Sequence, residues 1–397
     1  MSTVIDAGLR PDLQPLVVDL PTGTLRLDID ACDGSMPDLL GFATRANPRR
    51  AFLFLSKVLG KHYPAQPTAM EAVHRTLARG VPESSGPVVF VGMAETATGL
   101  GQGVFEAWME AHPGSAALYL QTTRYRIDAA QCLSFEESHS HAPRVFLHLP
   151  QDDAARATVR AARRVVLIDD ELSTGNTFVN LAAVLRSVMP ELASVHLATI
   201  SDFMGEARRC DVARRMEIDC SVDSLLRGFW HFEPNGNMTM AAAPAQCADG
   251  REVRLEDAGY GRLGRTAALA LPAALATRLA QEPVEGSTLV LGTGEFMHAA
   301  FVLGRALERC GVDVRVQATT RSPILRWGAV SHVLSVPDPY GEGVPNYLYN
   351  VRPGQYARVL VCHESAPNER LRQLAITLDA RLIHFKANDH AEEISVR

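Results

Sequence analysis

The sequence contains no apolar stretch close to the ~20 residues that a membrane-spanning helix requires. The segment from Met1 to Leu16 lacks a basic region followed by an apolar one, so we expect no secretory signal. The seven cysteines are scattered and form no Cys-x-x-Cys pair. An odd, dispersed set is typical of reduced thiols and argues against a zinc ribbon. These absences predict a cytoplasmic protein with no membrane partner.

The chain also lacks an excess of positive charge. Its formal net charge is −6, so broad electrostatic attraction to nucleic acid is not expected, and we find no basic helix-turn-helix-like segment. The absence of a Gly-x-x-x-x-Gly-Lys-Ser/Thr loop disfavours a P-loop kinase. Gly292-x-Gly294 lacks the third glycine of a dinucleotide fingerprint because position 297 is methionine, which is too weak a signal for a dehydrogenase.

What the chain does contain is enough material for two or three domains of roughly 100–200 residues each. Hydrophobic residues make up 47% of its 397 residues and charged residues 21%, as in globular proteins. Alanine, glycine and proline become frequent over residues 235–284, which places a boundary and connecting helices there. We expect one α/β domain over residues 15–235 and a second α/β domain over residues 236–397.

The most informative segment runs from Val165 to Thr177. Val165–Ile168 reads as a buried parallel strand, and the carboxylates of Asp169 and Asp170 follow at its end. A Ser/Thr/Gly turn then leads into a stretch of helical character, Phe178–Val188. A turn that opens a helix presents backbone N–H groups at the positive end of the helix dipole, which suits a phosphate. Since carboxylates accept from sugar hydroxyls, one loop could hold both ends of a ribose 5-phosphate.

This segment resembles the phosphoribosyl-pyrophosphate (PRPP) signature of type I phosphoribosyltransferases: four apolar residues, two acidic residues and a Thr-Gly-x-Thr loop. The resemblance implies that Asp169 and Asp170 bind the ribose 2- and 3-hydroxyls and, through these hydroxyls or water, a Mg²⁺ ion. It also implies a cradle for the 5-phosphate, made of Ser173, Thr174, Gly175, Asn176 and Thr177. Glu171 departs from the pattern, which usually has an apolar residue there. This third acid serves a variant substrate or a metal, or points to solvent.

A second glycine-bearing loop precedes that motif. The buried strand Val88–Val91 leads into it, and a helix through Trp108 follows. In type I phosphoribosyltransferases the loop at this place contacts pyrophosphate, which implies that role for Gly92, Met93, Ala94, Glu95 and Thr96. Glu95 is unusual in a loop that binds anions. It ligates Mg²⁺, pairs with an arginine, or binds an amine of the acceptor.

Basic residues cluster before this loop. Residues 49–61 read as a helix on which Arg50, Lys57 and Lys61 share one face. That face either clamps phosphates or is solvated, and the charges gathered at its start, including Arg49, favour the clamp. We therefore add Arg49 to the pyrophosphate residues.

The mobile catalytic loop of such enzymes falls between the third strand, Ala117–Gln121, and the PRPP motif. His139 and His141 lie in this interval beside two glutamates and are candidate acid/base groups or metal ligands; the alternative is a polar surface turn. Arg124 or Arg49 is a candidate for neutralising the leaving pyrophosphate.

The ends of the first domain also carry signals. Residues 15–35 alternate in polarity around Pro21-Thr22-Gly23, which predicts a β-hairpin that forms a small hood. Phe229, Trp230 and Phe232 follow the last strand. They either stack on the acceptor base or, as we prefer, pack in the core.

The C-terminal half contains an echo of the first domain. Thr288–Leu291 reads as a strand, a glycine loop with Glu295 follows, and the next strand ends in Thr-Thr-Arg, as it does at Thr122-Thr123-Arg124. We interpret this as an internal repeat of one α/β unit. The repeat suggests a second candidate site formed by Gly292, Gly294, Glu295, Thr320, Arg321 and Ser322. Six polar residues beside apolar strands either form a second phosphate or substrate site or satisfy one another at a domain interface: Arg321, Asn346, Asn350, Arg352, His363 and Glu364.

The string Thr320-Arg321-Ser322-Pro323 resembles the TRSP domain, which is paired with a divergent, orotate-phosphoribosyltransferase-like enzyme in bacterial gene clusters of the tellurite-resistance type. This resemblance spans roughly residues 20–390 and implies the making of a nucleoside-like metabolite. It predicts a type I phosphoribosyltransferase-like parallel sheet flanked by helices with an N-terminal hood. It implies Mg²⁺, PRPP, an acceptor that the sequence does not identify, and a homodimer. The alternative is a non-catalytic regulatory protein that binds PRPP or nucleotides.

Overall fold

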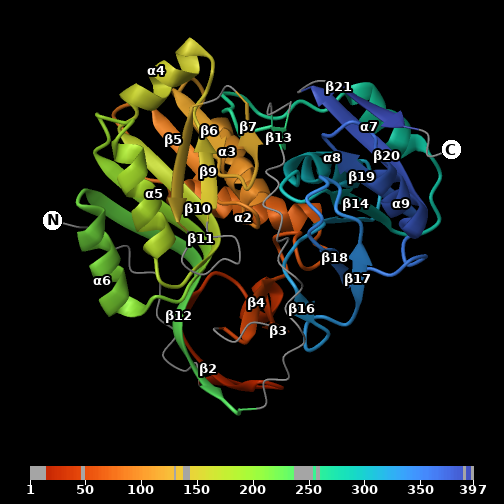
Figure 1. The fold of residues 1–397 in the computed structure, drawn as a ribbon, viewed down its shortest axis with the longest axis horizontal. Helices are drawn as coiled ribbons and strands as arrows, with labels where there is room; N and C mark the ends of the chain where they lie inside the picture. The colour runs from red at the N-terminus through yellow and green to blue at the C-terminus, as the bar shows by residue number, and fades with distance from the viewer. Residues whose placement is uncertain are drawn as a thin grey trace.

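The computed structural model describes residues 15–45, 50–128, 131–136, 144–236, 254–255, 260–387 and 390–394 (Figure 1). The predicted site residues Arg49, His139 and His141 lie outside this part of the chain. Within it, no helix combines the length and apolar character needed to cross a membrane.

A seven-stranded sheet in the order β1-β2-β12-β11-β10-β5-β6 forms the N-terminal half. Its parallel strands are β5 (Val88–Gly92), β6 (Ala117–Gln121), β10 (Arg164–Leu172), β11 (Ser194–Asp202) and the first part of β12 (Asp219–Pro234). Its helices are α2 (Pro67–Gly80), α3 (Thr98–Ala111), α4 (Asp153–Ala161), α5 (Asn176–Arg186) and α6 (Gly205–Met216). The chain leaves β5 toward β6 on one side, whereas β10 pairs with its other side. Ligands of such sheets bind where the order reverses, outside the carboxyl ends of the strands, here β5 and β10.

The hood begins with the predicted hairpin, β1 (Leu16–Leu20) and β2 (Gly23–Cys32). β2 pairs antiparallel with the second half of β12, and a register shift between Arg227 and Gly228 separates this half from the part that follows β11. The hood continues through α1 (Met36–Leu39), β3 (Leu40–Arg45) and β4 (Phe52–Ser56). One long strand therefore joins the hood to the main sheet.

The helix expected over residues 49–61 is wrong. Residues 52–56 form β4, whose five side chains are all buried and which pairs antiparallel with β3. The spacing of the basic residues suggested one helical face, but the apolar run between them is a strand buried on both sides. Lys57 donates to the carbonyl of Pro37, and Lys61 is fully buried. They do not share a solvent-facing surface.

A second sheet, in the order β15-β14-β19-β20-β21, forms the C-terminal half. Its strands are β14 (Thr288–Gly292), β15 (Val314–Ala318), β19 (Arg358–His363), β20 (Ala380–Ala387) and the antiparallel β21 (His390–Ile394). Helices α7 (Ala273–Gln281) and α8 (His298–Arg309) pack on one face, and α9 (Glu369–Leu378) packs on the other. The fold is thus α/β in both halves, as the sequence predicted.

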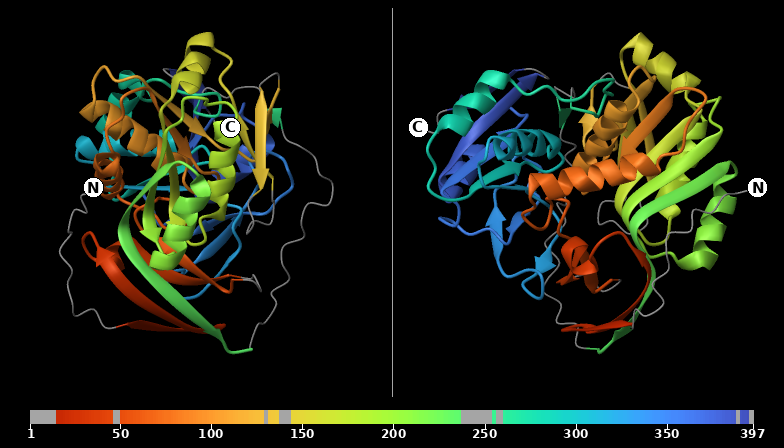
Figure 2. Two further views of the ribbon diagram at one scale, coloured as in Figure 1. Left: turned by 90° about the vertical axis from the view of Figure 1, so that its left-hand side faces the viewer. Right: turned by 180° about the vertical axis from the view of Figure 1, so that it is seen from behind.

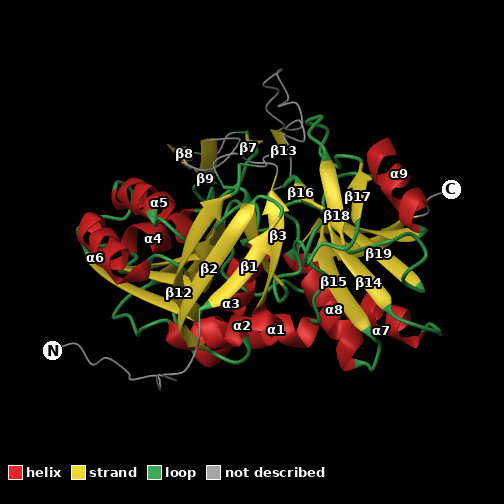
Figure 3. Ribbon diagram, turned by 90° about the horizontal axis from the view of Figure 1, so that it is seen from below, coloured by secondary structure: helices red, strands yellow, loops and turns green. Residues whose placement is uncertain are grey.

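The two halves share more than a linker. Figure 2 shows α2 running between the two sheets, and Ala65, just before it, exchanges two backbone hydrogen bonds with Val316 of β15, at 2.9 and 2.8 Å. β16 (Ile324–Leu325) pairs antiparallel with β3 of the hood, between the two main sheets (Figure 3). Buried residues of β3, β4, β16 and Tyr349 form a common apolar cluster.

Short pieces complete the described structure. β17 (Val333–Val336) and β18 (Asn346–Tyr349) form a hairpin in the C-terminal half, and β8 (Cys132–Glu136) pairs with β9 (Arg144–His148). β7 (Arg126–Ile127) pairs in parallel with β13 (Arg254–Leu255), which also joins residues from the two halves of the chain.

Candidate active site

The predicted acidic pair lies at the carboxyl end of β10, beside the point where the strand order reverses. The predicted strand includes both carboxylates and runs two residues further, because β10 pairs with β11 as far as Leu172, whereas β5 stops at Gly92. The backbone N–H of Asp170 donates to Oδ1 of Asp169 at 2.9 Å. Burial raises the pKa of Asp170 and the nearby Glu171 raises it further, whereas Asp169 and Arg45 act in the opposite direction. The protein therefore holds this carboxylate at some energetic cost.

The predicted phosphate cradle forms the start of α5. Gly175 precedes the helix with φ of +71° and has no side chain to cap it, and the N–H of Asn176 makes a long hydrogen bond to Oγ1 of Thr174, at 3.5 Å. The outer side of the loop is held by α6: Arg208 donates to the carbonyl of Ser173 at 3.1 Å, and Arg215 donates to Oδ1 of Asn176 at 2.8 Å. The first backbone N–H groups of a helix without a cap are suited to an anion.

We expect Gly175→Ala to destabilise the protein by about 1–3 kcal/mol and to weaken phosphate binding. A Cβ at this position would lie 2.5 Å from Cγ2 of Val212, and the left-handed backbone adds strain. Gly114→Ala is a matched control because Gly114 also has a positive φ, of +86°, but has no atom within 4 Å of the new Cβ. Urea unfolding of both variants would reveal the steric cost, and equal stabilities would contradict the tight packing of the cradle.

Glu171, the residue that departs from the sequence pattern, pairs with Arg50 of the hood. Nη2 of Arg50 lies 2.7 and 2.9 Å from the two carboxylate oxygens. The guanidinium also lies over the ring of Phe52, 4.9 Å from its centroid. Glu171 therefore joins the hood to β10. The sequence alone predicts that Glu171 serves a variant substrate or a metal, or points to solvent. Its pairing with Arg50 is not among these expectations.

The aromatic residues of β12 divide into two groups. Trp230 and Phe232 pack on Phe52, with ring centroids 4.8 and 5.1 Å apart, which agrees with the preferred core role. Phe229 is 47% exposed.

The second glycine-bearing loop lies directly beside the acidic pair. The N–H of Met93 donates to the carbonyl of Ile168 at 2.9 Å, and the N–H of Ala94 donates to Oγ1 of Thr122 at 2.7 Å. The peptide bond between Ala94 and Glu95 is cis. The loop predicted to face pyrophosphate is thus fixed next to the residue that precedes Asp169.

Glu95 pairs with two cations, which agrees with one of the three roles considered for it. Its carboxylate lies 2.9 Å from Nζ of Lys61 and 2.9 Å from Nε of Arg321. Burial by itself would raise the pKa of Glu95, but Lys61 and Arg321 hold that pKa below its usual range. Lys61 is fully buried and also donates to the carbonyl of Gly294 at 2.7 Å.

Two further basic residues, His62 and Arg45, take part in the electrostatics of this region. Burial, together with Arg45 and Lys61, lowers the pKa of His62 to about 3, so its ring is neutral. Arg45 also acts on the pKa of Asp170, in the direction that lowers it. Sequence reasoning missed Arg45, because nothing local marks the end of a hood strand as part of the site.

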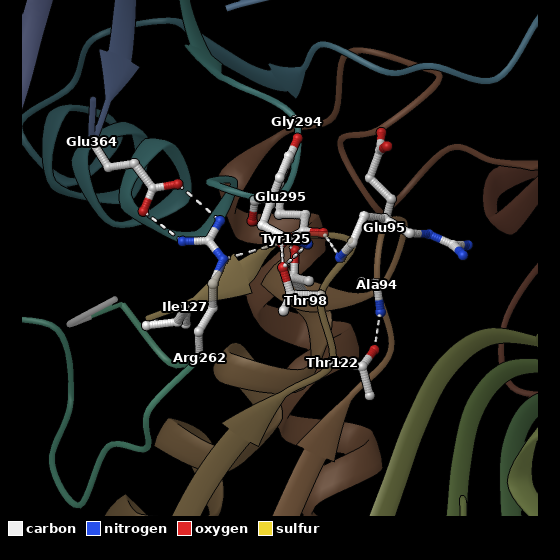
Figure 4. A network of polar contacts seen from close by, with 12 residues as sticks. Ala94, Glu95, Thr98, Thr122, Tyr125, Ile127, Arg262, Gly294, Glu295 and Glu364 are labelled. Atoms are coloured by element: carbon white, nitrogen blue, oxygen red, sulfur yellow. Dashed lines mark hydrogen bonds and ion pairs between the residues drawn. The ribbon is translucent and has the colours of Figure 1, made fainter. Parts of the chain in front are cut away.

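The second candidate site is occupied by the protein's own contacts. Glu295 accepts from Oγ1 of Thr123 at 2.6 Å, from the backbone N–H of Arg124 at 2.8 Å and from Nε of Arg262 at 3.1 Å. The fully buried Arg262 also binds both carboxylate oxygens of Glu364 at 2.7 and 2.8 Å (Figure 4). Sequence reasoning missed Arg262, which lies outside every motif.

Thr320 and Ser322 of the second candidate site make hydrogen bonds within the C-terminal half. The N–H of Thr320 donates to the carbonyl of Tyr347 at 3.0 Å, and the N–H of Ser322 donates to Oγ1 of Thr320 at 3.2 Å. Arg321 is the residue of the TRSP string whose side chain reaches the first domain's loop.

Comparisons with known proteins give two family matches and a set of similar structures. Residues 39–229 match the family described as phosphoribosyl transferase, and residues 260–378 match the TRSP domain found C-terminal to it. Among curated proteins, none was found to be similar in sequence.

The similar solved structures include three adenine phosphoribosyltransferases. The Giardia lamblia enzyme, complexed with 9-deazaadenine, is 16% identical, with 47% of this chain and 92% of that chain covered and a TM-score of 0.30. The Trypanosoma brucei enzyme, in complex with AMP, pyrophosphate and ribose-5-phosphate, is 11% identical, with 53% and 87% covered and a TM-score of 0.32. The Leishmania donovani enzyme is 15% identical, with 48% and 80% covered and a TM-score of 0.33.

Proposed function

Because residues 39–229 belong to the phosphoribosyl transferase family and residues 260–378 form a TRSP domain, we propose that this protein is a Mg²⁺-dependent enzyme that transfers a phosphoribosyl group between PRPP and an acceptor. The observation that carries the proposal is the position of Asp169 and Asp170 at the end of β10, one short loop before the start of α5. Carboxylates that can accept from ribose hydroxyls lie close to backbone N–H groups that can donate to a phosphate.

For phosphoribosyl transfer the protein mainly has to orient the substrates and to stabilise the charges that develop as pyrophosphate leaves. Pyrophosphate leaves C1 of the ribose, that carbon gains oxocarbenium character, and a nucleophile attacks from the opposite face. In this proposal Asp169 and Asp170 hold the ribose and residues 173–177 hold the 5-phosphate. The loop Gly92–Thr96 faces pyrophosphate, and Arg124 or Arg49 offsets its charge. His139 or His141 carries a proton to or from the acceptor.

Mg²⁺ fits this site as an ion shared with the substrate. It is commonly bound through one or two carboxylates, waters and substrate phosphates, not through a cage made only of protein. Asp169 and Asp170 would hold the ion indirectly, through the ribose hydroxyls or water. Within the described ranges, no three His, Cys, Asp or Glu side chains gather to hold a metal by themselves. When bound, the ion would act as a Lewis acid on the pyrophosphate oxygens.

Calorimetric titration with PRPP and Mg²⁺ tests the proposal. We expect micromolar binding by the wild-type protein and its loss in the Asp169→Asn/Asp170→Asn double variant. If the folded wild-type protein binds no PRPP, the proposal that PRPP is the phosphoribosyl donor is wrong. Binding without pyrophosphate release, over a screen of amines and nucleobases in the cytoplasmic pH range, would favour the alternative of a regulatory PRPP-binding protein. The acceptor, and with it the nucleoside-like product, is identified by the same screen.

A further inference from the structure

The two glycine loops are built with the same bonds. In the first half, the N–H of Ala94 donates to Oγ1 of Thr122 at 2.7 Å, and the N–H of Thr122 donates to the carbonyl of Gly92 at 3.0 Å. In the second half, the N–H of Gly294 donates to Oγ1 of Thr319 at 2.9 Å, and the N–H of Thr319 donates to the carbonyl of Gly292 at 3.1 Å. The repeat seen in the sequence is therefore also a repeat in geometry.

The two halves exchange their loop glutamates. Glu295 of the second loop binds Thr123 and the backbone of Arg124 at the end of β6, whereas Glu95 of the first loop binds the backbone and side chain of Arg321 beyond the end of β15. Figure 4 shows Glu95 and Glu295 on neighbouring loops. Each loop is thus completed by the Thr-Thr-Arg segment of the other half.

The ion pairs of the two loop glutamates differ in how far solvent reaches them. The side chain of Glu295 is fully buried, and its second partner, Arg262, is 1% exposed. On the other side, the side chains of Glu95 and Arg321 are 12% and 17% exposed. The Glu95–Arg321 pair is therefore partly accessible to solvent, whereas the Glu295–Arg262 pair is buried.

Two carboxylates hold Arg321 while leaving part of its guanidinium available. Nε donates to Glu95 at 2.9 Å and Nη1 donates to Glu342 at 2.6 Å. Nη2 donates no hydrogen bond to another of the described residues. A guanidinium carries five N–H donors in a rigid planar fork that matches phosphate geometry. Because its orientation is already fixed, little conformational freedom would be lost when it binds an anion.

We propose that Arg321 binds the pyrophosphate group of the phosphoribosyl donor, so that the second half of the chain completes the active site of the first. This inference rests on the proposed function and adds a residue from outside the transferase domain. Glu95 then has a positioning role. It lies in the loop that faces the anion, and its carboxylate fixes the side chains of Lys61 and Arg321 beside that loop. Its presence there, which was unexpected from the sequence, follows from this arrangement.

Arg321→Ala tests the proposal by calorimetry with three probes: PRPP with Mg²⁺, inorganic pyrophosphate with Mg²⁺, and ribose 5-phosphate. We expect the Kd for PRPP and for pyrophosphate to rise about 10- to 100-fold, the loss typical of a hydrogen bond to a charged group. The Kd for ribose 5-phosphate should not change, because residues 173–177 bind that phosphate. Arg321→Lys keeps the charge and the pairing with Glu95 but loses the fork, so its loss should be smaller.

Arg326→Ala is the matched control, since this arginine lies in the same segment and is exposed. It should bind all three probes as the wild-type protein does. Equal losses for PRPP and ribose 5-phosphate in Arg321→Ala, or in Arg321→Lys if the alanine variant does not fold, would overturn the proposal in favour of a structural role. Unchanged PRPP binding would also overturn it. If the wild-type protein binds none of the probes, the proposed function itself fails and the role of Arg321 fails with it.

Discussion

Replacing Asp170 by asparagine is expected to reduce PRPP-dependent pyrophosphate release by about 100- to 1,000-fold, the effect typical of losing one group that stabilises transition-state charge. The carboxylate lies at the carboxyl end of β10, where it can accept from a ribose hydroxyl and face the positive charge that develops on the sugar. Asparagine has nearly the same shape but no charge. The substitution therefore removes the electrostatic contribution and keeps the packing.

The same variant should not lose stability. Burial raises the pKa of Asp170, which means that the folded protein disfavours its charged form. A neutral amide removes that penalty, so the thermal unfolding midpoint should stay the same or rise. Asp153→Asn serves as the control, because this carboxylate is 93% exposed on α4 and lies outside the motif. Unchanged turnover in Asp170→Asn, with the control also unchanged, would remove Asp170 from the proposed site.

Replacing Arg262 by alanine is expected to destabilise the protein by about 3–5 kcal/mol, the usual cost of removing one partner from a buried ion pair. Arg262 is fully buried and binds Glu364 through two hydrogen bonds and Glu295 through a third. Its loss would leave two carboxylates in the interior without their cation. Urea unfolding, followed by circular dichroism, measures the effect as a shift of the midpoint.

Arg278→Ala provides a matched comparison at the surface. Arg278 also contacts two carboxylates, those of Glu282 and Glu393 at 2.9 and 2.8 Å, but its side chain is 47% exposed. Exposed pairs of this kind contribute about 0–1 kcal/mol. If Arg262→Ala were no less stable than Arg278→Ala, the buried network around Arg262 would not contribute the stability that we expect of it.

The sequence predicted the repeating elements of the fold well, because local patterns determine them. Short apolar runs marked the central strands of both sheets, and alternation marked the hairpin of the hood. The segment 49–61 was misread because three basic residues had helical spacing while the apolar residues between them suited a strand. Residues 52–56 form a strand because both faces of β4 are buried in the folded protein, and the spacing of the basic residues does not reveal this burial.

Contacts between distant residues were not predictable in the same way. Glu171 looked like a free third acid, and only the folded chain brings Arg50 to it across 121 positions. Glu95 was expected to pair with an arginine as one of three options, but its partner, Arg321, lies 226 positions away. The motif showed where a ligand would bind, whereas the charges around it depend on how the two halves pack.

The pairing of β16 with β3 has a consequence for biosynthesis. Leu325 and Ile324 lie opposite Thr44 and Arg45, so the three-stranded sheet β16-β3-β4 acquires its last strand only after most of the chain has left the ribosome. Until then one edge of β3 offers unpaired backbone groups to other nascent chains. Arg45, which acts on the pKa of Asp170, gains its strand partner at the same late moment. An N-terminal half made without its successor would thus lack one strand of this sheet and would be prone to aggregate, so we expect the two halves to be inherited and expressed as one polypeptide.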